Sequence, residues 1–62
     1  MTNQYETVYE QALFDAAAMW EAYPGLEIRS GLKQAASDRG IPYGDEMQRF
    51  VDWAERRIFD GY

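Results

Sequence analysis

Residues 4–23, QYETVYEQALFDAAAMWEAY, decide the fold class of this chain. At about 100° per residue around a helix, a set of apolar and aromatic side chains falls within an arc of about 140°. The set consists of Tyr5, Val8, Tyr9, Ala12, Leu13, Ala16, Met19, Trp20 and Tyr23. The polar residues Glu6, Thr7, Glu10, Gln11, Asp15 and Glu21 fall outside it. The stretch therefore predicts an amphipathic helix, with Asn3 and Glu6 as a capping pair at its start.

Two groups of helix-breaking residues follow this segment. Pro24-Gly25 ends it, and Gly40-Ile41-Pro42 ends the next one. Proline stops a helix, and glycine accepts the left-handed conformation that caps one. The chain is thus divided into three segments with short connections.

The second segment predicts a helix over 27–39, with Gly40 just past its end. Its start stays open, because Ser30 could serve as the N-cap and leave 26–29 extended. The apolar stripe of this helix is narrow and consists of Ile28, Leu32, Ala35 and Ala36.

The third segment predicts a helix over 45–59, with Asp45 and Gln48 as the capping pair. Its apolar residues recur at helical spacing and are Met47, Phe50, Val51, Ala54 and Ile58. Arg56 and Arg57 fall in its last turns, where positive charge is favoured by the helix dipole.

Together the segments predict one all-α domain over 1–62, a compact three-helix bundle. A chain of 62 residues is difficult to stabilise, since domains of about 60 residues bury only about 60% of the surface exposed by the unfolded chain. With no Cys, disulfides are excluded. The aromatic residues, at 16% of the sequence, are the expected source of packing energy.

The residue types argue against chemistry by this chain alone. It contains neither His nor Cys, which leaves Ser30 and Ser37 without an imidazole to activate them. Glu6 and Glu10 share a helix face, which we interpret as a solvated surface rather than a metal site. We expect no enzyme activity, no cofactor and no bound metal.

The net charge of −5 opposes binding to phosphate backbones and anionic membrane surfaces. One alternative is a nucleic-acid-binding helix-turn-helix formed by the second and third segments. In it, Arg29, Lys33 and Arg39 would contact the phosphate groups of the nucleic acid. Asp45 and Glu46 at the start of the would-be recognition helix speak against it. A second alternative is an acidic DNA mimic. Such proteins usually carry a denser negative charge than the −5 on these 62 residues.

The sequence predicts a cytoplasmic protein. No basic residue precedes Glu6, unlike a secretory leader, and the longest apolar run, from Ala16 to Trp20, is far too short to cross a bilayer. In size and composition, though in no motif, the chain resembles the very small acidic helical accessory proteins of phages and bacteria.

Several aromatic residues lie away from the predicted core. Phe14 falls on the polar arc between Glu10 and Glu21, while Trp53 and Phe59 flank the stripe of the third segment on opposite sides, and Tyr62 ends the chain. Exposed aromatic groups often mark protein contacts. We therefore predict an interaction protein that binds a protein partner or a second copy of itself. The candidate contact residues are Phe14, Trp53, Phe59, Glu10 and Glu21. The alternative is that Trp53 and Phe59 only widen the core and that Phe14 is an ordinary exposed side chain.

Overall fold

The computed structural model describes the backbone of residues 4–60 and the side chains of 7–60. It contains three helices, α1 (Gln4–Ala22), α2 (Ile28–Asp38) and α3 (Asp45–Phe59), and the described residues include no strand. The predicted all-α three-helix fold is therefore confirmed, with helix ends that differ from the prediction by at most one residue. No helix in this part of the chain combines the length and apolar character needed to span a bilayer.

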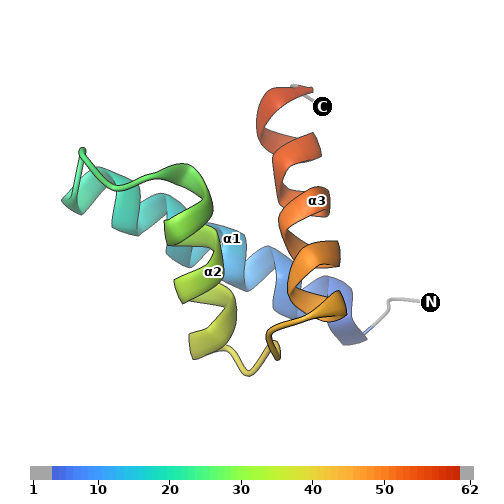
Figure 1. The fold of residues 1–62 in the computed structure, drawn as a ribbon. Coiled ribbons are helices and arrows are strands. Elements are labelled where there is room, and N and C mark those ends of the chain that lie inside the picture. The colour runs from blue at the N-terminus through green and yellow to red at the C-terminus, as the bar shows by residue number, and fades with distance from the viewer. Residues whose placement is uncertain (1–3, 61–62) are drawn as a thin grey trace.

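The three helices are arranged with α1 as a base. In the view of Figure 1, α2 and α3 run in opposite directions and both cross α1 steeply, α2 toward its C-terminal half and α3 toward its N-terminal half. The C-terminal half of α3 extends beyond α1. This arrangement buries one face of α1 under two helices and leaves its other face outside the bundle.

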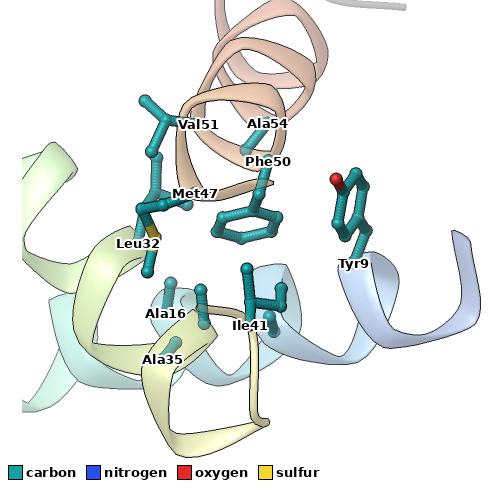
Figure 2. Close-up of a cluster of buried hydrophobic side chains, with 11 residues drawn as sticks. Tyr9, Ala16, Leu32, Ala35, Ile41, Met47, Phe50, Val51 and Ala54 are labelled. Atoms are coloured by element: carbon teal, nitrogen blue, oxygen red, sulfur yellow. The ribbon is translucent and has the colours of Figure 1, made fainter. Parts of the chain in front are cut away.

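An apolar cluster contributed by all three helices holds the described part of the chain together. Phe50 and Leu32 are the largest fully buried side chains among the described residues, and Figure 2 shows the Phe50 ring above Ile41 and beside Tyr9. Full burial of such a side chain contributes about 1.5–3 kcal/mol. Among the described residues, the buried hydrophobic members of this cluster are Tyr9, Ala12, Ala16, Leu32, Ala35, Ala36, Ile41, Met47, Phe50, Val51 and Ala54.

Gly40 ends α2 as the sequence predicts. Its φ of +88° is in the left-handed region, its N–H donates to the carbonyl of Ser37 (3.0 Å), and the N–H of Ile41 donates to the carbonyl of Ala36 (2.9 Å). This pair of bonds is a Schellman motif. In this motif the residue after the glycine commonly makes a hydrophobic contact with the last turns of the helix. Ile41, only 3% exposed, is the core residue that the motif adds.

The predicted N-caps need correction. Asp45 is the first residue of α3, and the N-cap is Gly44, with a φ of +115° and no side-chain capping bond. Gln48 donates instead to Oδ1 of Asp52 (2.9 Å). Glu27, in extended conformation, is the N-cap of α2, so Ser30 lies inside the helix. The proposed Asn3 cap and the Glu6 side chain lie outside the described residues.

Three residues assigned to apolar faces are less buried than predicted. Tyr23 is 67% exposed and follows the last residue of α1, Ala22, so that the helix ends one residue earlier than expected. Ile28 is 38% exposed at the first turn of α2, and Ile58 is half-buried near the end of α3.

Gly31 is a buried position that the apolar pattern did not indicate. The indole of Trp20 lies so close that a Cβ at this position would collide with the indole nitrogen. That Nε1 group is buried and has no hydrogen-bond partner among the described residues. The close contact between α1 and α2 therefore depends on the absence of a side chain at Gly31.

Candidate functional site

A shallow hollow lies between α1 and α3, with a volume of about 290 Å³. We call it the α1–α3 hollow, and its lining residues are Glu10, Leu13, Phe14, Ala17, Trp53 and Arg57. Phe14 is the most prominent of them, with 78% of its surface exposed. The hollow thus combines exposed aromatic surface with one carboxylate and one guanidinium group.

Trp53 is held in the hollow by aromatic residues of the core. Its ring centroid lies 5.4 Å from that of Tyr9 and 6.2 Å from that of Phe50, the latter in a stacked arrangement. The guanidinium carbon of Arg57 lies 4.7 Å from the Trp53 ring centroid, which is a cation–π contact. Trp53 is half-buried, so one part of the indole packs inside while another part remains available at the surface.

Glu10, Phe14, Ala17 and Glu21 form the outer stripe of α1, as we call it. Their spacing of four, three and four residues places them on one helix face, and all of them are exposed. Only the first three line the hollow. The stripe therefore has an apolar centre and a carboxylate at each end.

Phe59 belongs to a different surface. It is 63% exposed and lines a second hollow of about 290 Å³ with Asp52, Glu55, Arg56 and Asp60. Of the predicted contact residues, the structure brings together Glu10, Phe14 and Trp53, and it places neither Phe59 nor Glu21 in their hollow. Tyr62 lies outside the described residues.

Two of the basic residues considered for nucleic-acid binding are held in ion pairs. Arg39 donates from Nε to Oδ2 of Asp15 (2.8 Å) and from Nη1 to Gln11 (3.1 Å), which links α1 to the end of α2. The hydrogen bond from Arg39 lowers the pKa of the Asp15 carboxyl below its ordinary value, and the same bond raises the pKa of Arg39.

Arg29 makes the corresponding link between α2 and α3. It donates from Nε to Oε2 of Glu55 (2.9 Å) and from Nη2 to Oε1 (3.3 Å), and this bonding raises its pKa. The third candidate, Lys33, is exposed on α2. Both arginines thus have a carboxylate partner within the fold, which a phosphate would have to replace.

Sequence reasoning missed Leu13, Ala17 and Arg57 as parts of the hollow. Leu13 had been assigned to the core, and Arg57 to the helix dipole. The spacing of four residues between Trp53 and Arg57 was the signal that could have found Arg57, because such pairs are neighbours on a helix.

The side chains lining the hollow are two aromatic rings, two aliphatic groups, one carboxylate and one guanidinium group. The described residues include no cluster of three or more His, Cys, Asp or Glu side chains placed to hold a metal ion. No family model, curated protein or solved structure matches this chain. The interpretation of the hollow therefore depends on its own side chains.

Proposed function

We propose that this protein acts by binding a protein partner, or a second copy of itself, through the α1–α3 hollow. The observation that carries the proposal is the exposure of Phe14 beside Trp53. Removing a phenylalanine side chain from water is worth about 1.5–3 kcal/mol, and this fold leaves most of that gain unused. Aromatic and arginine side chains also dominate the binding energy of protein interfaces.

The arrangement of Trp53 favours recognition as well. A side chain that is fixed before binding loses less conformational entropy when a partner arrives. The rings of Tyr9 and Phe50 and the guanidinium of Arg57 all contact this indole and limit its movement. A partner would meet a surface that is already ordered.

The test compares Phe14→Glu with Tyr43→Glu. Tyr43 is also an exposed aromatic, but it lies in the loop between α2 and α3 and does not line the hollow. Affinity capture and the mass in solution are measured for both variants and for the unchanged protein. We expect Phe14→Glu to lose the captured partner or the dimer while the helical circular dichroism is kept, and Tyr43→Glu to behave as the unchanged protein.

If Phe14→Glu leaves both partner capture and the mass in solution unchanged, the hollow is ordinary surface and the proposal is wrong. The same preparations test the nucleic-acid alternative, since binding to DNA should fall steeply with salt and should be lost in Lys33→Glu. They also test the DNA-mimic alternative, in which the captured protein would be a DNA-binding one. The cytoplasmic location is a further proposal, and cell fractionation tests it.

A further inference from the structure

Given the function proposed above, we propose that the α1–α3 hollow and the outer stripe of α1 bind an amphipathic helix with a basic rim. The occupant is a helix of another protein. Its apolar side chains would lie on Phe14, Ala17 and Trp53, and its Lys or Arg residues would face Glu10 and Glu21.

The charges at the ends of the outer stripe carry the argument for a basic partner. Glu10 and Glu21 are exposed, and neither has an ion-pair partner among the described residues. The remaining described carboxylate of α1, that of Asp15, is bound by Arg39. The described part of α1 has no Lys or Arg, so no basic side chain of this helix offsets the two carboxylates.

The same charges disfavour a second copy of the chain on this stripe. In an antiparallel pair of α1 helices, Glu10 of each copy would face Glu21 of the other. In a parallel pair, each carboxylate would face the equivalent carboxylate of the other copy. Like charges that meet across an interface are costly. Two copies would also bring together two net charges of −5.

The geometry of the stripe fits a helix. Its spacing of four, three and four residues is that of the contact seam between packed helices. Ala17, with the neighbouring exposed Ala18, is small enough to let another helix approach closely. From Glu10 to Glu21 the stripe rises by about 16 Å, which a partner helix of about eleven residues would match.

Arg57 sets the orientation of the charges on the partner. Its guanidinium lies over Trp53, and both residues line the hollow from α3, whereas Glu10 lines it from α1. The basic rim of the occupant therefore belongs on the α1 side, and its α3 side should be neutral or acidic.

Two synthetic helical peptides test the inference. Both carry leucines along one seam, and they differ only in whether the two positions flanking the seam, about 16 Å apart, are Lys or Glu. Each peptide is titrated into isotope-labelled protein, and the amide signals of 10–21 and the Trp53 indole signal are followed by NMR. We expect the Lys peptide to shift these signals and to bind about tenfold more tightly than the Glu peptide.

Two double variants separate local charge from net charge. Glu10→Lys with Glu21→Lys should invert the peptide preference. Glu27→Lys with Asp38→Lys changes the net charge equally at exposed positions of the α2 region and should leave the preference as it was. A helical circular dichroism spectrum identical to that of the unchanged protein shows that each variant is folded.

The inference is overturned if the peptides bind equally, if the Lys peptide fails to bind at about 1 mM, or if both double variants change the preference alike. A Phe14-dependent dimer that excludes the Lys peptide overturns it too. Such a dimer would leave the proposed function intact. The proposed function would also survive if both peptides bound equally but only to protein in which Phe14 is intact. If Phe14→Glu changes neither peptide binding, nor partner capture, nor the mass in solution, the proposed function fails as well.

Discussion

The two faces of α1 contact the rest of the molecule in opposite ways. On its inner face the helix presents Ala12 and Ala16, which are fully buried, and it meets α2 closely enough to leave no room for a side chain at Gly31. Toward the C-terminal half of α3 it presents Phe14, which is exposed beside a hollow. Small residues thus line the closed contact and a large one lines the open contact, which indicates that the first face serves stability; the second face is the one proposed above to bind a partner.

The largest expected effect comes from comparing two phenylalanines. Phe50→Ala removes a fully buried ring from the centre of the core and should lower the free energy of unfolding by about 3–5 kcal/mol, enough to unfold so small a domain. Phe14→Ala should change it by no more than about 0.5 kcal/mol. Urea denaturation followed by circular dichroism measures both. Equal losses would show that Phe14 also supports the fold.

The next effect tests the closed contact between α1 and α2. Gly31→Ala gains helix propensity worth about 1 kcal/mol but forces a methyl group against the rigid indole of Trp20, and we expect a net loss of about 1–2 kcal/mol. Ser30→Ala, at the exposed neighbouring position, is the control and should be neutral or slightly stabilising. A stabilised Gly31→Ala variant would mean that the two helices can separate at little cost.

A smaller effect is expected at the open contact. Arg57→Ala removes the cation–π contact with Trp53 and should cost about 0.5–1 kcal/mol. Arg56→Ala removes the same charge from the neighbouring residue, which does not line this hollow. Thermal unfolding of the two variants gives the comparison. Identical midpoints would mean that Arg57 contributes only its charge.

Much of the inner face of α1 could be predicted from the sequence, because helical periodicity is a local property. The same periodicity placed Phe14 outside the core. It failed where tertiary contacts decide burial, as at Gly31, which is buried by the Trp20 ring, and at Ile41, which is buried through the turn after Gly40.

The candidate site was less predictable than the fold, because it depends on how α1 and α3 cross. Trp53 and Phe59 both fall beside the core stripe, but six residues of helix place them about 120° apart. Only Trp53 therefore faces the hollow. No single helix pattern could show that Phe14 shares a hollow with one of these aromatic residues and not with the other.

The smallest effect concerns the ion pair between Asp15 and Arg39, which links α1 to the end of α2 at the surface beside the closed contact. Because the bond from Arg39 holds the pKa of Asp15 below its ordinary value of 3.8, folding is favoured by the ionised carboxylate at neutral pH. This contribution is complete above the ordinary value and is lost as the pH falls through the lower folded value, so Asp15→Asn should flatten the stability curve below about pH 4. Denaturation curves at a series of pH values, with and without this substitution, measure the difference. Since the carboxylate remains accessible to solvent, with 34% of the side chain exposed, the change should be small and should shrink with added salt. Parallel curves for the two proteins would show that the closed contact is held by packing against α2 alone.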